Sequence, residues 1–171
     1  MAALRLRPVR RADLEMLERW WGDPEAQGHH NWFGFAPSEW LRRRFDQDGL
    51  LGEDRGNLLV ELPDGNLAGD VSYYAVHHGP NPGSRAFNLG IALLPAHRGQ
   101  GLGAEAQRQL AAYLFANTMV ERLEASTDVE NLAEQRALER AGFTREGVLR
   151  HAQFRDGSFH DLVLYSRLRG D

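Results

Sequence analysis

The chain has 171 residues, of which 42% are hydrophobic, so it is long enough to bury one core and too short for two ordinary domains. We therefore expect one domain over residues 1–171. Its formal net charge of -4 argues against nucleic acids and anionic membranes as partners, because both select basic surfaces. The chain has no cysteine, which excludes a disulfide framework, a thiolate nucleophile and a thiolate zinc site.

No segment of the sequence predicts export or membrane insertion. Residues 1–11 alternate apolar and basic side chains without the apolar centre of a signal peptide, and no apolar run approaches the length of a membrane span. We therefore expect a cytoplasmic protein, monomeric or homodimeric, whose partner is a small molecule or a peptide end.

The first elements are predicted to be a short strand and two helices. Leucine and arginine alternate over residues 4–9, which predicts a strand, and a helix with one apolar side begins at Asp13. Residues 22–37 form an irregular and unusually aromatic segment. Pro37 fits the first turn of a second helix.

Three strands are predicted next. Residues 58–62 and 67–76 have strand character, and the turn-forming residues 63–66 separate them. A flexible connection over residues 79–83 leads to a largely buried strand over residues 86–94.

The C-terminal half alternates helices with strands. In chain order we expect a helix with its apolar side over 102–114, a strand over 122–126, a helix from Asn131 to the C-cap Gly142, and strands over 147–154 and 159–168. Asp156 and Gly157 join the last two strands as a hairpin. Hairpins at both ends and one strand-helix-strand crossover predict an α/β or α+β fold with a mixed, mostly antiparallel sheet flanked by helices.

The segment over residues 93–104 has the composition of an anion-binding loop. Glycines between a buried strand and a helix let the backbone approach a ligand, and the free N–H groups at the helix start face an anion. Arg98 adds a positive charge at the mouth. The alternative is that Gly99, Gly101 and Gly103 only make a tight turn.

A dinucleotide site is a competing interpretation of the same loop. Gly99, Gly101 and Ala104 fit the G-x-G-x-x-A pattern, and Glu124 or Asp128 stands near the place of its ribose-binding acid. In dinucleotide-binding proteins the first glycine directly follows the strand, whereas residues 95–98 intervene here. We therefore give a nicotinamide cofactor the lower rank.

The loop resembles the cofactor signature of the GCN5-related N-acetyltransferase (GNAT) family, which is Arg or Gln, two residues, Gly, one residue, then Gly or Ala. Here these positions are Arg98, Gly101 and Gly103. A longer ordered pattern resembles the branch that acetylates ribosomal-protein N-termini and related amines. Its members here are Asn131, residues 138–143 and 146–150, Asp156, Gly157, Asp161 and Tyr165.

The resemblance implies a sheet that opens after the strand ending near Leu94, with the pantetheine arm of acetyl-CoA in the gap. An N–H group near Leu93 is then expected to stabilise the reacting oxyanion, and Asn131 to bond the arm. The pyrophosphate is expected to bind the backbone N–H groups of Arg98, Gly99, Gln100, Gly101, Leu102 and Gly103. Asn131 also fits a capping box with Glu134, and both roles are compatible.

The catalytic groups are less evident. Many relatives carry a glutamate near the position of Asn88 and a tyrosine at the position of Leu138, and this sequence has neither. The branch that this chain resembles has a serine where Glu134 stands, which makes Glu134 a candidate for the protonation of the thiolate. Asp70 is a candidate base, or else a solvated carboxylate beside a bulge.

The aromatic segment supplies the remaining candidates. His29 and His30 titrate near neutral pH and are candidates for proton relay, or else have no role. Trp32, Phe33 and Phe35 line an apolar acceptor pocket or belong to the core. No histidine pair has zinc-site spacing, and we expect no metal.

We therefore expect an N-acetyltransferase that moves an acetyl group from acetyl-CoA to a primary amine of a peptide N-terminus, an antibiotic or a small metabolite. With a weak or water-mediated base, an amine of low pKa is the expected acceptor. The alternatives are a non-catalytic acyl-CoA sensor and a nicotinamide-dependent enzyme.

Overall fold

The computed structural model describes residues 3–37 and 39–171. Its strands form one sheet in the order β1-β2-β3-β4-β5-β7-β6. The strands are β1 (Arg5–Pro8), β2 (Arg55–Glu61), β3 (Leu67–His77), β4 (Arg85–Leu93), β5 (Arg122–Asp128), β6 (Thr144–Arg155) and β7 (Ser158–Leu168). The main helices are α1 (Leu14–Trp21), α2 (Pro24–Gln27), α3 (Trp40–Asp48), α4 (Leu102–Asn117) and α5 (Leu132–Arg140).

The sheet is mixed and mostly antiparallel, as predicted. Among the described residues the only parallel pair is β4 with β5, and α4 makes the crossover between them. The other neighbouring strands pair antiparallel. This topology confirms the predicted α/β (α+β) class with hairpins at both ends.

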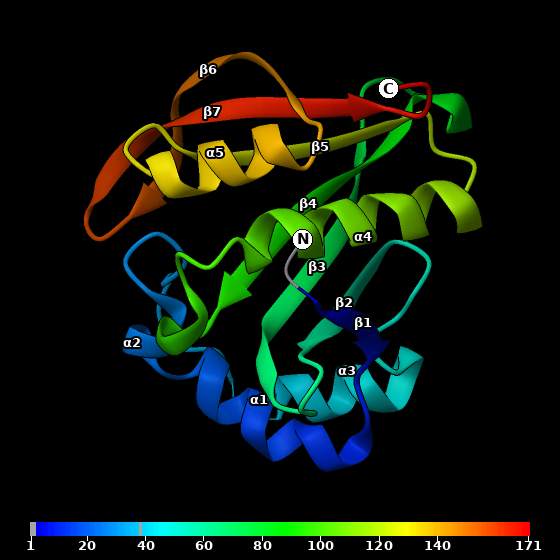
Figure 1. Ribbon diagram of the computed structural model, residues 1–171. Coiled ribbons are helices and arrows are strands. Elements are labelled where there is room, and N and C mark those ends of the chain that lie inside the picture. Colours follow the sequence, from blue (N-terminus) through cyan, green and yellow to red (C-terminus); the bar gives the residue numbers. More distant parts are fainter. Residues whose placement is uncertain (1–2, 38) are drawn as a thin grey trace.

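The helices cover the sheet on two faces, because successive strand side chains point to opposite sides. In β2, Leu58 and Val60 pack into the cluster that contains α4 and α5, whereas Leu59 packs into the cluster that contains α1 and α3. Figure 1 shows α4 lying across the middle of the sheet and α1 and α3 together at its lower end. None of the helices in the described part is long and apolar enough to cross a membrane.

The sheet opens between its two parallel strands. Cα partners join β4 and β5 at only three positions, from Phe87 with Leu123 to Leu89 with Ala125. Beyond these positions β4 stays paired with β3 as far as Leu93, while β5 stays paired with β7 as far as Asp128. The two strands therefore diverge, as Figure 1 shows, and leave a wedge-shaped gap in the sheet.

Some predicted boundaries were wrong, two of them for local reasons and one because of strand pairing. The irregular segment 22–37 contains α2, which Pro24 begins and the Asp23 side chain caps by accepting from Glu25 N at 2.9 Å. Pro37 precedes α3, since its carbonyl accepts from Trp40 N in a turn before the first helical residue. Pairing with β3 extends β2 back to Arg55, beyond its apolar run.

Candidate active site

The free edge of β4 supplies backbone donors to the gap. Leu94 N donates to Ala68 C=O across the β3 pairing at 2.9 Å. Because antiparallel residues alternate in the direction of their hydrogen bonds, the N–H and C=O groups of Ile91 and Leu93 point away from β3, toward the gap. Arg98 Nε bonds the Leu93 carbonyl from that side at 2.8 Å, and Asn31 Nδ2 bonds the Ile91 carbonyl at 3.0 Å.

The glycine loop leads directly into the N-terminus of α4. Gly99 and Gly101 have φ of 73° and 79°, in the left-handed region that glycine adopts without strain, and Gly101 is the N-cap residue. Apart from the two chain neighbours, no atom of the described residues lies within 4 Å of where a Cβ would stand at either position. The first N–H groups of a 16-residue helix therefore face open space, which suits an anion.

The Arg98 side chain also has a structural role. Besides its bond to the Leu93 carbonyl, it donates through Nη2 to the Ala26 carbonyl at 2.7 Å. A Cβ at Gly28 would stand 3.1 Å from this guanidinium, and Gly28 has a φ of 79°, so both the packing and the backbone favour glycine there. Arg98 thus joins the end of α2 to the end of β4, and its charge stays at the edge of the gap.

The gap forms a cavity of about 400 Å³, here called the gap cavity. It brings together most of the predicted site residues: His29, His30, Leu93, Arg98, Gly99, Gly101, Gly103, Asn131 and Glu134. Two predicted cofactor residues are turned away, because the Gln100 amide bonds the Ala96 carbonyl and the Leu102 side chain is buried in the core. Only their backbone groups remain available to a ligand.

Asn131 caps α5, but the predicted capping box is only half formed. Its Oδ1 accepts from Glu134 N at 3.3 Å, while its own N–H donates to the Asp128 carbonyl rather than to Glu134. The Glu134 carboxyl group is therefore free to line the gap cavity. Burial raises the pKa of Glu134 to about 7, although the neighbouring Gln107 amide favours the charged form.

A second cavity of about 370 Å³, here called the sheet-face cavity, lies on the side of α1 and α3. Asn57, Asp70 and Ser72 form a polar floor on β2 and β3, and small residues of β4 complete it. The remaining wall is aromatic and basic, with Trp21, Trp40, Arg44, Tyr73 and Tyr74. Gln27, Asn31 and Ile91 line both cavities, so the two meet at the free edge of β4.

Asp70 is buried in the floor of this cavity, with 6% of its surface exposed. Its two carboxylate oxygens accept from Trp21 Nε1 and Asn57 Nδ2, each at 3.2 Å. Burial raises the pKa of Asp70 to about 6, although both bonds favour the charged form. The alternative of a solvated carboxylate is wrong, although the bulge is present in the neighbouring pairing of Val60 and Glu61.

His30 lies at the gap cavity beside a buried ion pair. Its Nδ1 is buried without a hydrogen bond among the described residues and stands 4.0 Å from Asp128 Oδ2. Asp128 accepts from Arg155 Nη2 at 2.6 Å, and both of these side chains are buried. Burial lowers the pKa of His30 although Asp128 opposes the effect, so the ring is mostly neutral at physiological pH.

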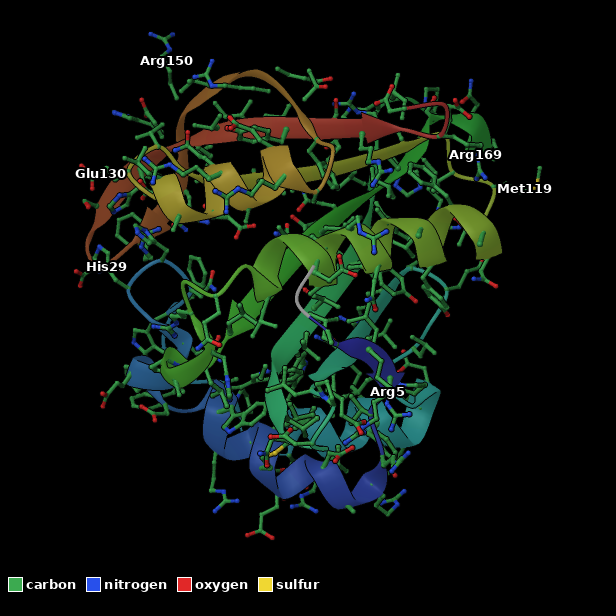
Figure 2. The ribbon with its side chains drawn as sticks, in the orientation of Figure 1. Arg5, His29, Met119, Glu130, Arg150 and Arg169 are labelled. Atoms are coloured by element: carbon green, nitrogen blue, oxygen red, sulfur yellow. The ribbon has the colours of Figure 1, made fainter. Side chains whose placement is uncertain are left out.

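The predicted aromatic acceptor residues lie in a separate place. Trp32 and Phe33 line a third cavity with Phe154, between the loop after α2 and the β6–β7 hairpin. Figure 2 shows His29 below the tip of that hairpin. Phe33 is 59% exposed and Phe35 is 84% exposed, so neither belongs to the core, and Phe35 lines none of the three cavities.

Several residues at the cavities were not predicted. Arg136 and Arg140 line the gap cavity from α5 and add positive charge opposite the glycine loop. Their spacing of four places them on one helix face, a signal present in the sequence. Arg44 had a signal too, since it follows Leu41 by three residues and so lies on the buried side of α3.

Two positions bear on the missing catalytic groups. Leu138 is fully buried in the core, so it offers no substitute for a phenol at the gap. Asn88 is buried in β4 and pairs with Tyr74 of β3 and Glu124 of β5. Asp70, His30 and Glu134 are the carboxyl and imidazole groups at the two cavities whose pKa is raised or lowered, which makes them the candidates for proton transfer.

Comparison with known proteins gives a consistent result. The model of the acetyltransferase (GNAT) domain family matches residues 3–144. The chain is 25% identical to an N-acetyltransferase named p20 from Bacillus licheniformis, over 97% of this chain and 93% of the relative. It is 26% identical to the ribosomal-protein-serine acetyltransferase of Escherichia coli (strain K12), over 81% of this chain and 76% of that protein.

A solved structure shares the whole fold. The spermidine N-acetyltransferase of Vibrio cholerae, in complex with CoA and spermine, superposes with a TM-score of 0.83 at 21% identity, over 98% of this chain and 96% of that one. The nicotinamide and sensor alternatives are thereby set aside, since the family model covers both the glycine loop and the opened sheet. The chain belongs to the GNAT acetyltransferase family and is an acetyl-CoA-dependent N-acetyltransferase.

Proposed function

We propose that the chain acetylates primary amines of low pKa, such as the α-amine of a peptide or of a small metabolite. The supporting observation is that the gap cavity and the sheet-face cavity meet at Asn31 and Ile91, on the free edge of β4. The gap cavity takes the donor and the sheet-face cavity takes the amine. The two substrates then approach each other at the opening of the sheet.

The gap cavity fits acetyl-CoA in its shape and in its donors. The N–H groups at the start of α4 suit the pyrophosphate, and Arg136 and Arg140 add charge on the opposite side. Asn131 keeps one Nδ2 hydrogen beyond its bond to Thr127, which suits the pantetheine arm. The Leu93 N–H, which points into the gap, is placed to donate to the carbonyl oxygen as negative charge develops there.

The reaction requires two proton transfers. The amine nitrogen forms a bond to the acetyl carbon, the carbon–sulfur bond breaks with its electrons on sulfur, and the nitrogen loses one proton. Asp70 accepts that proton, directly or through water, and with a pKa of about 6 it is mostly ionised near pH 7. His30 is the second candidate, because its ring is mostly neutral and lines the gap cavity.

Glu134 is the proposed proton donor to the thiolate. It lines the gap cavity, and with a pKa of about 7 a substantial fraction stays protonated at neutral pH. A carboxylic acid at this place replaces the phenol or hydroxyl that related enzymes use.

The proposed amine class follows from the weakness of the base. An α-amine has an ordinary pKa of about 8, against about 10.4 for a lysine side chain, so more of the α-amine is already neutral. The relatives allow two acceptor classes, since one is named for ribosomal-protein serine and another is complexed with spermine. A base of pKa about 6 favours the α-amine.

The test is the pH dependence of kcat/KM for a peptide with only an α-amine, a peptide with only a lysine amine, and spermidine. We expect the α-amine to react fastest, and Asp70→Asn to lower kcat/KM roughly tenfold to a hundredfold with acetyl-CoA binding kept. Asp46→Asn, an exposed aspartate on α3, is the matched control and should retain full activity.

Two results contradict this proposal. Faster acetylation of lysine or spermidine shows that a stronger base exists than Asp70. Complete inactivity of Asp70→Asn, with acetyl-CoA binding intact, shows that Asp70 is a dedicated base that water cannot replace.

A further inference from the structure

Arg44 is a buried cation without a buried counter-ion. It lies on the inner side of α3, lines the sheet-face cavity and has 6% of its surface exposed. Within residues 3–37 and 39–171, no carboxylate oxygen lies within 4.0 Å of its nitrogens. A charge in this situation is costly to bury, because no carboxylate contacts it and Asp48 stabilises it only from a longer distance.

The bonds of Arg44 leave one edge of the guanidinium free. Nη1 donates to Asn57 Oδ1 at 3.2 Å, and the Trp40 ring lies 5.7 Å from the guanidinium carbon. Nε and Nη2 have no hydrogen-bond partner in the described part of the chain. These two nitrogens share one edge of the planar group and direct parallel N–H bonds, the geometry that binds both oxygens of a carboxylate.

Asn57 links this cation to the proposed base. Its Oδ1 accepts from Arg44, while its Nδ2 donates to Asp70 Oδ2 at 3.2 Å. The floor of the cavity therefore presents a carboxylate at one end of the amide and a guanidinium at the other. Such a pair complements a ligand that carries an ammonium group and a carboxylate, and it repels a polycation at the guanidinium end.

We infer that Arg44 binds a carboxylate of the acceptor, so that the acceptor is an amino acid or short peptide with an α-amine and a free carboxylate. This inference rests on the proposed function, since it assigns the sheet-face cavity to the acceptor. Nε and Nη2 are closed from solvent, so a carboxylate reaches them only when the side chains that cover them move.

Burial is consistent with this role. Burial lowers the pKa of Arg44 and the charge of Arg55 acts in the same direction, while Asp48 opposes them, so the net effect disfavours the free cation. A bound carboxylate removes that penalty, which makes the site selective for anions over neutral isosteres.

The test compares glycyl-phenylalanine with glycyl-phenylalaninamide, whose α-amines are alike because a peptide bond separates them from the varied group. We expect kcat/KM to be at least tenfold higher for the free carboxylate, in line with a hydrogen-bonded charge pair. Arg44→Gln should abolish this preference and Arg44→Lys should keep part of it. Arg43→Gln, an exposed neighbour on α3, is the matched control and should keep all of it.

A second measurement needs no turnover. Binding of the acetylated products, N-acetylglycyl-phenylalanine and its amide, is measured by calorimetry in the presence of CoA, with the carboxylate expected to bind more tightly only when Arg44 is present. Equal kcat/KM for both dipeptides in the parent overturns the inference and leaves the α-amine proposal intact. An equal loss on both dipeptides in Arg44→Gln also overturns it, since a structural role acts that way. If the parent acetylates neither dipeptide, the α-amine proposal fails and the binding comparison alone decides on Arg44.

Discussion

Replacing Asp70 by asparagine tests the buried carboxylate through folding as well as catalysis. In the native protein burial raises the pKa of Asp70 from an ordinary 3.8 to about 6, so the folded state binds its proton more tightly than the unfolded state. The stabilisation from that proton is complete below the pKa that Asp70 has in the unfolded state. It is lost as the pH rises through the pKa that Asp70 has in the folded state. Asparagine does not titrate, so Asp70→Asn lacks this loss.

The size of the effect follows from the two pKa values. At about 1.36 kcal/mol for each pKa unit, the difference between 3.8 and about 6 corresponds to about 3 kcal/mol. Part of this stabilisation is already lost at about pH 4. We therefore expect the unfolding free energy of Asp70→Asn, relative to that of the parent, to rise by about 2 to 3 kcal/mol between about pH 4 and about pH 7.5.

The loss of one hydrogen bond lowers the unfolding free energy of Asp70→Asn by an amount that does not depend on pH. An amide can accept from Trp21 or from Asn57 but not from both, which costs about 1 kcal/mol at every pH. The titration of Glu134 is common to both proteins and cancels in the comparison. Only the pH dependence of the difference therefore reports on Asp70.

The assay is urea unfolding of both proteins across that pH range, with equal m-values as the check that the unfolded states are comparable. Asp46→Asn, at an exposed aspartate of α3, is the control for replacing a carboxylate by an amide and is measured in the same way. A difference between parent and Asp70→Asn that stays flat within a few tenths of a kcal/mol refutes the buried, proton-binding carboxylate.

Two further substitutions test the gap cavity. Acetyl-CoA, but not NADH or ATP, should raise the melting temperature of the parent, and Gly101→Val should lose most of that rise because its side chain enters the anion space. Gly65 also has a positive φ and open surroundings but lies in the β2–β3 turn, so Gly65→Val should lose stability and keep the increase in melting temperature that acetyl-CoA causes. An equal loss of this increase in both variants counts against the glycine loop as the binding site. Glu134→Gln should lower kcat roughly tenfold to a hundredfold without changing the KM for acetyl-CoA. The control Glu130→Gln should leave kcat unchanged. Full activity of Glu134→Gln would show that Glu134 is not the proton donor.

The fold was predictable because its signals are local. Strand alternation, turn residues and the C-cap at Gly142 depend on neighbours in sequence, and the structure places the predicted strands and long helices accordingly. The errors at α2 and at the start of α3 each depend on a single hydrogen bond. The Asp23 side chain caps the start of α2, and the bond from Trp40 N to the Pro37 carbonyl forms a turn before α3. The extension of β2 comes from pairing with β3, which no local pattern encodes.

Local sequence patterns alone predict one part of the candidate site, the glycine loop. A glycine loop between strand and helix indicates an anion site wherever it occurs, and the structure places Gly99 and Gly101 at the N-terminus of α4. Arg44 stands in a run of three arginines, where its spacing from Leu41 indicates the buried side of α3, but its place at a cavity depends on how α3 packs on the sheet. The burial of Asp70 likewise depends on Trp21 and Asn57, which are distant in sequence.

The opening of the sheet explains why the two cavities belong to one site. An intact sheet separates its faces, so a ligand on the side of α1 and α3 cannot meet one held between α4 and α5. Where β4 leaves β5, the edge of β4 is unpaired, and Ile91 lines the cavities of both sides. The same unpaired edge directs the Leu93 N–H into the gap. Under the proposed function, a single topological feature therefore provides the passage for the amine and the donor for the developing charge, and a substitution that restores pairing beyond Leu89 should remove both together.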